Sequence, residues 1–263
     1  MTWRQRPSKL EKSRLGLYDA LVRWTIALAV TFFATSAHAG RTRFGWLYDT
    51  ETVPQRGVEL ETWMLEEDHK GSPPVDETSL WLAPVIGVTD QVELAFPIEF
   101  SFTSDATGSR TDLDRLGAEL RWRLTSPDPV ESGPFSALVR LAAKRLVTDR
   151  GAIRLEPGLV LGLDFWRVHL VADIEGVIEI PDVGNVRSEF RPGAGLSLQI
   201  AGELRAGGEF YSEIGLFDNP TVTWFAVGPV VSWTHGRVWM VASCPIGLQN
   251  ITAAPRLNWA VAF

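Results

Sequence analysis

Arginines and glutamates that recur at alternate positions in the second half of the chain are the residues best suited to chemistry. When the segments that carry them are aligned by their turns, six side chains fall at similar height: Arg140, Glu156, Glu175, Arg191, Glu209 and Tyr211. Guanidinium groups and carboxylates form strong directional pairs, and neighbouring strands place such side chains about 5 Å apart. The set therefore predicts either an ion-pair network that fills a protein interior or a path that selects solutes by charge.

Other kinds of chemistry find less support in the residues. His169 shares a strand face with Asp173, but about 13 Å of extended chain separates them, and no serine stands in a nucleophile motif. The four histidines and the single Cys244 do not have the spacing of a zinc site. The Gly-rich stretch Pro192–Gly195 precedes no helical pattern, so it indicates a strand that passes a crowded interior and not a phosphate cradle. We therefore expect no enzymatic activity, no metal and no cofactor.

The elements that would position the charged residues are β-strands of about ten to fourteen residues. In Gln91–Phe102 every second residue from Val92 onward is apolar, while Glu93 and Glu99 lie on the other face. Such period-two alternation is typical of a strand with one apolar face. The pattern recurs at 57–68, 77–88, 112–124, 134–146, 152–164, 167–180, 186–200, 203–216, 221–235, 237–249 and 255–263. The predicted total is about twelve strands.

An even number of strands with one apolar and one charged face predicts an all-β protein: a transmembrane up-and-down antiparallel β-barrel over residues 57–263. A soluble two-sheet sandwich is the alternative, because its strands give similar signals. Six prolines fall inside the predicted strands, where each removes a hydrogen-bond donor. These are Pro84, Pro97, Pro157, Pro192, Pro229 and Pro245.

Tryptophan and phenylalanine form a second feature of the predicted strands. Four of them fall on the predicted lumen face: Trp63, Trp81, Phe225 and Trp233. They could guide an aromatic or aliphatic solute, pack around a plug or form a subunit contact. Others are placed as girdle residues at the membrane interface, namely Trp122, Trp166 and Trp259.

The two ends of the chain have the organisation of an exported protein. Residues 1–39 are expected to be a secretory signal peptide, because basic residues precede the apolar Trp24–Ala37 and an A-x-A site follows; a membrane anchor is the alternative. Removal of this segment takes away six of the 25 Lys/Arg and two of the 32 Asp/Glu, so 19 basic and 30 acidic residues remain, a net charge of −11. Such a negative charge argues against nucleic acid as a partner. Residues 40–56 are a polar, aromatic-containing lead-in, either periplasmic or a plug.

The last segment, Pro255–Phe263, alternates between apolar and small or polar residues up to its final phenylalanine. A barrel needs its last strand to close against its first, so that no open edge is left in lipid. The segment also resembles the terminal strand of bacterial outer-membrane barrels, whose final Phe is read by the assembly machinery. That resemblance implies this machinery as a partner through Phe263, and outer-membrane lipid as the surroundings.

Two stretches resemble a family of bacterial outer-membrane barrels named for the MetA pathway of phenol degradation and described as transporters. LWLAPVIGVTDQVELAFPIEF combines Pro84 inside a strand, the turn Gly87–Asp90 and Glu93 in the next strand, and TETVPQRGVELET is similar to that family's first strand. The resemblance implies a channel or transporter for small solutes, hydrophobic or aromatic ones included, in the outer membrane of a Gram-negative-type bacterium. A closed structural or adhesive barrel without a conducting path is the alternative.

Overall fold

The computed structural model describes residues 42–106, 108–147, 151–216 and 223–263. The predicted signal peptide, residues 1–39, lies outside the described residues. All the strands belong to one compact unit, Ala37–Ala262.

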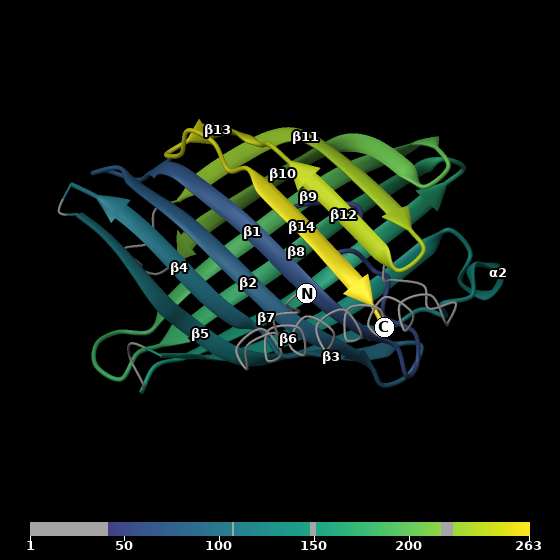
Figure 1. The fold of residues 1–263 in the computed structure, drawn as a ribbon, viewed down its shortest axis with the longest axis horizontal. Coiled ribbons are helices and arrows are strands. Elements are labelled where there is room, and N and C mark those ends of the chain that lie inside the picture. Colours follow the sequence, from purple (N-terminus) through teal and green to yellow (C-terminus); the bar gives the residue numbers. More distant parts are fainter. Residues whose placement is uncertain (1–41, 107, 148–150, 217–222) are drawn as a thin grey trace, which may run out of the picture. The chain divides into compact units, whose positions relative to one another are not determined.

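The strands form one antiparallel sheet that closes on itself (Figure 1). In chain order they are β1 (Val58–Lys70), β2 (Val75–Gly87), β3 (Val92–Ala95), β4 (Ile98–Asp105), β5 (Gly108–Arg123), β6 (Phe135–Leu146), β7 (Ile153–Phe165), β8 (Val168–Ile180), β9 (Arg187–Ala201), β10 (Leu204–Leu216), β11 (Trp224–His235), β12 (Val238–Ser243), β13 (Ile246–Gln249) and β14 (Arg256–Ala262). β3 and β4 occupy one position between β2 and β5. β12 and β13 both pair with β11. The first strand pairs with the last, with Leu60 opposite Val261, which completes a closed twelve-stranded barrel. The predicted fold class is therefore confirmed.

Two predicted strands are interrupted at proline. Gln91–Phe102 divides into β3 and β4 around Pro97, and Pro245 lies between β12 and β13. Proline donates no backbone hydrogen bond, so a ladder is easily broken at such a residue. The other four prolines lie within continuous strands. The remaining strand limits differ from the predicted ones by a few residues.

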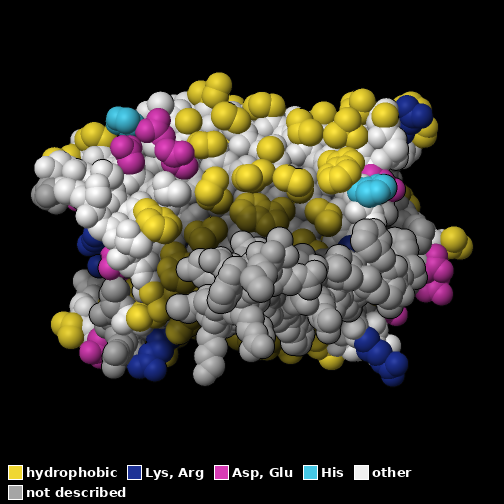
Figure 2. Space-filling model, in the orientation of Figure 1, with side chains coloured by type: hydrophobic (Ala, Val, Ile, Leu, Met, Phe, Trp, Pro, Cys, Tyr) yellow, Lys and Arg dark blue, Asp and Glu magenta, His cyan; other side chains and the backbone are white. Residues whose placement is uncertain are grey.

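The two faces of the wall differ in the way that the alternation predicted. Outward side chains such as Met64, Trp122 and Leu141 are apolar and exposed. Inward side chains such as Arg121 and Arg140 are buried and charged. Figure 2 shows hydrophobic side chains over the visible wall, with charged ones nearer its two ends. A soluble sandwich would bury its apolar face, so this arrangement excludes that alternative.

The predicted phase of β11 is wrong. Phe225 and Trp233 do not face the interior; Trp233 is exposed, and the buried aromatic residue of this strand is Trp224. β11 is apolar on both faces, with Val230 pointing inward and Val231 outward. Alternation of hydrophobicity therefore carries no information about which face of this strand points inward. The other two predicted aromatics, Trp63 and Trp81, are buried in the interior as expected, where they belong to one hydrophobic cluster.

The barrel has two distinct ends. We call the end where β1 begins and β14 ends the terminal end; tight connections at 166–167, 202–203 and 236–237 lie there. We call the opposite end the loop end; its connections include 147–152, 181–186 and 250–255. The long connection at 124–134 is an exception at the terminal end, and it contains the short helix α2 (Pro129–Ser132). No helix among the described residues is long and apolar enough to cross a membrane.

Candidate functional site in the barrel interior

Inward charged side chains form a belt of ion pairs around the interior, with Arg140 on β6 at its centre. Its guanidinium nitrogens lie 2.9 Å from Glu156 Oε2 on β7 and 2.6 Å from Glu175 Oε2 on β8. A third contact, of 3.1 Å, joins Arg140 to Glu119 on β5. All four side chains are buried. Charge-assisted bonds of this kind hold the strands' inward faces together and satisfy groups that would be costly to bury alone.

The belt continues around the wall to the first strand. Arg191 on β9 lies 3.8 Å from Glu175 and 2.9 Å from Glu213 on β10. Glu213 in turn lies 3.0 Å from Lys70 Nζ, at the end of β1, and Lys70 also pairs with Glu67 at 2.8 Å. The structure therefore brings together four of the six residues that the sequence singled out, namely Arg140, Glu156, Glu175 and Arg191.

The other two predicted residues have different partners. Glu209 accepts hydrogen bonds from the backbone N–H groups of Gly45 at 3.0 Å and Trp46 at 3.1 Å. Tyr211 packs against Trp46, with 4.7 Å between ring centroids. Across the ladder, Glu209 faces glycines on both neighbouring strands, so no cation lies directly opposite it. All six predicted residues therefore point inward; four belong to the belt, whereas Glu209 and Tyr211 contact the lead-in.

The lead-in, of which residues 42–56 are described, lies inside the barrel. Phe44, Leu47 and Val53 are buried among inward side chains of the strands. The backbone N–H of Tyr48 donates to Asp173 on β8 at 2.9 Å. On the side of β14, Asn258 donates to the carbonyl of Gly45 at 2.7 Å. Sequence reasoning assigned no roles to these lead-in residues.

Two glycines on β9 make room for the lead-in. A Cβ atom at Gly195 would lie 2.4 Å from Phe44 Cε1, and one at Gly193 would lie 2.2 Å from Leu47 Cδ2. Both distances are shorter than any ordinary contact, so only glycine lets the segment approach the wall. The interpretation of Pro192–Gly195 as a strand that passes a crowded interior is therefore confirmed.

A polar cluster fixes the lead-in near the terminal end. Asp49 Oδ2 lies 2.9 Å from Arg43 Nη1, and Asp49 Oδ1 lies 3.1 Å from His169 Nε2. Burial by itself raises the pKa of Asp49, but the charges of Arg43 and His169 outweigh it and hold this pKa below its usual value. His169 Nδ1 also lies 2.9 Å from Asp164. His169 is thus held by acidic partners other than Asp173, the one considered from the sequence.

A cavity of about 330 Å³ lies in the interior beside the lead-in. Belt residues near the loop end, such as Lys70 and Glu213, line this cavity. Trp46 and Tyr48 of the lead-in line it as well and form what we call its floor. The Tyr48 ring lies 4.0 Å from the guanidinium carbon of Arg140, so the floor contacts the centre of the belt. The lining contains both acids and bases, and it also contains aromatic residues. Such a lining can contact a small molecule through charges and ring faces together.

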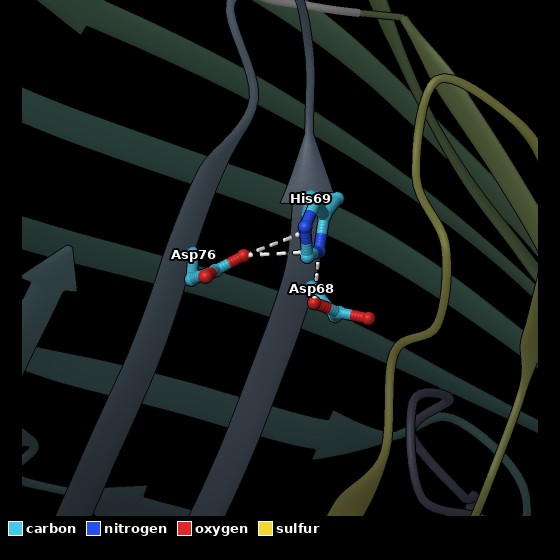
Figure 3. A group of neighbouring side chains, drawn as sticks. All are labelled: Asp68, His69 and Asp76. Atoms are coloured by element: carbon cyan, nitrogen blue, oxygen red, sulfur yellow. Dashed lines mark hydrogen bonds and ion pairs between the residues drawn. The ribbon is translucent and has the colours of Figure 1, made fainter. Parts of the chain in front are cut away.

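A histidine and two aspartates meet at the loop end on β1 and β2 (Figure 3). His69 Nδ1 lies 3.3 Å from Asp76 Oδ1 and also forms an ion pair with Asp68. The side chain of His69 is 58% exposed, and that of Asp76 is 50% exposed. The histidine is already held by both carboxylates, so the cluster is described as a surface ion pair.

Comparison with known proteins identifies the fold. No family model and no curated protein matches the sequence, so the resemblance to the MetA-pathway family stays a prediction. An outer-membrane channel from Pseudomonas putida F1 superposes with a TM-score of 0.58 and 11% identity, over 82% of this chain and 98% of that one. The NanC porin gives 0.53 and 7%, over 78% and 98%. The β-domain of the Bordetella autotransporter BrkA gives 0.51 and 12%, over 79% and 99%.

These likenesses show that the chain folds as bacterial outer-membrane β-barrels do. The three proteins are described as a channel, a porin and an autotransporter domain. At such identities the comparison establishes the fold, and the fold alone serves more than one function.

Proposed function

We propose that this protein is an outer-membrane channel for small solutes and that the lead-in closes the terminal end of its interior. The observation that carries the proposal is the charged cavity of about 330 Å³ on the loop-end side of the lead-in. Ligand pockets have volumes of about 300–1,000 Å³, so the cavity suits a small molecule. Longer loops face the outside of the cell and short turns the periplasm. A solute would then enter at the loop end and meet Trp46 and Tyr48.

Passage requires the lead-in to move. Its anchors are hydrogen bonds to Glu209 and Asp173 and the packing of Phe44 against Gly195. None of these bonds belongs to the ladder of the wall, so the segment can leave without breaking the barrel. The P. putida channel and the NanC porin, which share the fold, support a role in solute passage.

The proposal includes the path by which the chain reaches the membrane. Residues 1–39 are removed as a signal peptide, which leaves the lead-in as the new N-terminal segment. The strand ending in Phe263 is recognised by the barrel assembly machinery, and the barrel lies in the outer membrane of a Gram-negative-type bacterium. Support comes from the A-x-A site in the sequence, the closed sheet and the apolar outer face.

Single-channel conductance of Gly195→Val in a planar bilayer tests the proposal. The new side chain collides with Phe44 and Leu47, and overpacking of this kind costs about 1–3 kcal/mol. The ratio of open to closed channels should therefore rise roughly 5- to 150-fold. Gly176→Val is the matched control, because a Cβ there points to the outer face and finds its nearest atom, in Pro157, at 3.6 Å. We expect its conductance to equal that of the wild type.

The outcome also decides between the two candidate functions. If folded Gly195→Val is as silent as the wild type, and deletion of residues 42–52 also produces no openings, the channel is refuted. A closed structural barrel then becomes the better account, and the dense ion pairs of the belt would favour it. If openings occur, Arg191→Ala should shift their ion selectivity toward cations, because the variant removes a positive charge from the cavity wall.

A further inference from the structure

One cation in the cavity wall differs from all the others. Arg256, the first residue of β14, forms no ion pair with any carboxylate among the residues that the structure describes. Its Nε donates to Asn258 Oδ1 at 3.1 Å, and its two Nη groups make no hydrogen bond there. Each of the other cations in the lining has at least one acidic partner: Lys70, Arg115, Arg140, Lys144, Arg154, Arg187 and Arg191. Arg256 therefore brings to the cavity a guanidinium that no carboxylate of the described residues contacts directly, although Glu209 and Glu175 act on it from a greater distance.

Two indole rings hold this guanidinium in place. Its central carbon lies 4.9 Å from the ring centroid of Trp46 and 4.5 Å from that of Trp63. Cation–π attraction favours both contacts. Trp63 in turn stacks on Trp81, with 4.2 Å between centroids and 19° between planes. The lead-in, β1, β2 and β14 thus build one aromatic recess around a cation whose Nη groups remain available.

We propose that Arg256 binds the carboxylate of a small organic acid and that the Trp63–Trp81 stack contacts the acid's apolar body. The planar fork of a guanidinium matches a carboxylate, which can accept two parallel hydrogen bonds. One unpaired cation matches one negative charge, and Glu175 in the same lining would repel a second one. The site therefore favours a monocarboxylate. This inference rests on the proposed function and names the class of solute that the channel takes.

The position of the site connects binding to the lead-in. Trp46 belongs to the lead-in, and its neighbouring N–H groups are held by Glu209. Arg256 lines both the large cavity and a smaller one on the other side of Trp46 and Tyr48. A carboxylate on Arg256 would therefore lie at the point where the path is closed.

Binding of benzoate to the protein purified from outer membranes tests the site, with calorimetry and tryptophan fluorescence as readouts. Benzamide has the same ring without the charge, and acetate has the charge without the ring. We expect benzoate to bind more tightly than either probe. Arg256→Gln should weaken benzoate binding about 10- to 100-fold, the range for a lost hydrogen-bonded charge. Arg256→Lys keeps the charge but lacks the fork, so its loss should be intermediate.

Arg205→Gln is the matched control. Arg205 is another inward arginine without an acidic partner in the described structure, but it donates to Ser197 Oγ at 2.9 Å near the terminal end and does not line the cavity. Arg205→Gln removes the same charge as Arg256→Gln, but from a place outside the cavity, so the affinity for benzoate should stay unchanged. Heat-dependent gel mobility confirms that each variant is a folded barrel.

Three results would overturn the site: equal affinity for benzoate and benzamide, benzoate binding that survives Arg256→Gln, or acetate binding as tight as that of benzoate. The channel and the site can fail separately. Benzoate binding that depends on Arg256 in a protein that never conducts supports the site and refutes the channel. Conductance in Gly195→Val without benzoate binding supports the channel and refutes the site.

Discussion

Replacement of Arg140 by alanine removes the guanidinium at the centre of the ion-pair belt. Three carboxylates lose a partner, but not equally. Glu119 and Glu156 each keep another cation within 2.8 Å. In the described structure Glu175 keeps only Arg191, at 3.8 Å. The variant therefore leaves one buried carboxylate with a weakened partner, and that carboxylate determines the effect on stability.

The size of the effect follows from burial. Removal of one partner from a buried ion pair costs about 3–5 kcal/mol. Glu175 lines the cavity, where water can solvate it in part, so we expect a loss of about 2–4 kcal/mol in the free energy of unfolding. Arg187→Ala is the comparison, because Arg187 lines the same cavity but is 54% exposed and pairs with Glu179 at 3.5 Å. An exposed pair of this kind contributes less than about 1 kcal/mol.

Urea unfolding of the barrel in lipid vesicles, followed by tryptophan fluorescence, measures both losses. The second substitution Glu175→Gln, added to Arg140→Ala, removes the stranded charge and should recover about half of the lost stability. If Arg140→Ala costs no more than Arg187→Ala, the belt does not act as a buried network. If Glu175→Gln adds to the loss instead of relieving it, the stranded carboxylate is not its cause.

Two further predictions concern the outer wall and the anchor of the lead-in. Leu141 lies on the outer face near the middle of β6, so Leu141→Arg should lower the free energy of unfolding in vesicles by about 2–4 kcal/mol; a variant as stable as the wild type would show that this face does not contact lipid. The pKa of Asp49 is low, since the charges of Arg43 and His169 outweigh the effect of burial. Its contribution to holding the lead-in is therefore present above the unfolded pKa of about 3.9 and lost as the pH falls further. Channel opening, measured as conductance against pH, should therefore rise below about pH 4 in the wild type. Asp49→Asn has no carboxylate to protonate there, so a rise of the same size in that variant contradicts this assignment.

The strands and their faces could be predicted from the sequence because alternation is a local property. Glu93 and Leu94 are neighbours in the chain, and their opposite orientation follows from the geometry of any extended strand. The same reasoning places Arg140 and Glu175 inside without knowledge of their partners. This reasoning fails at β11, because residues on both faces of that strand are apolar. It placed Phe225 inward, whereas Trp224 is the residue that faces the interior.

The partners inside the barrel were decided by tertiary structure. Gly45 and Glu209 are 164 residues apart in the chain and meet only because the lead-in enters the closed barrel. The register between strands determines which acids stand beside Arg140, and the same register leaves Arg256 without one. A period-two pattern contains no information about register or about a segment that folds into the interior. The amino-acid sequence by itself therefore determines an outer-membrane type of barrel with a charged inner face, while the lead-in inside it and the aromatic surroundings of Arg256 arise only when distant strands and the lead-in are brought together.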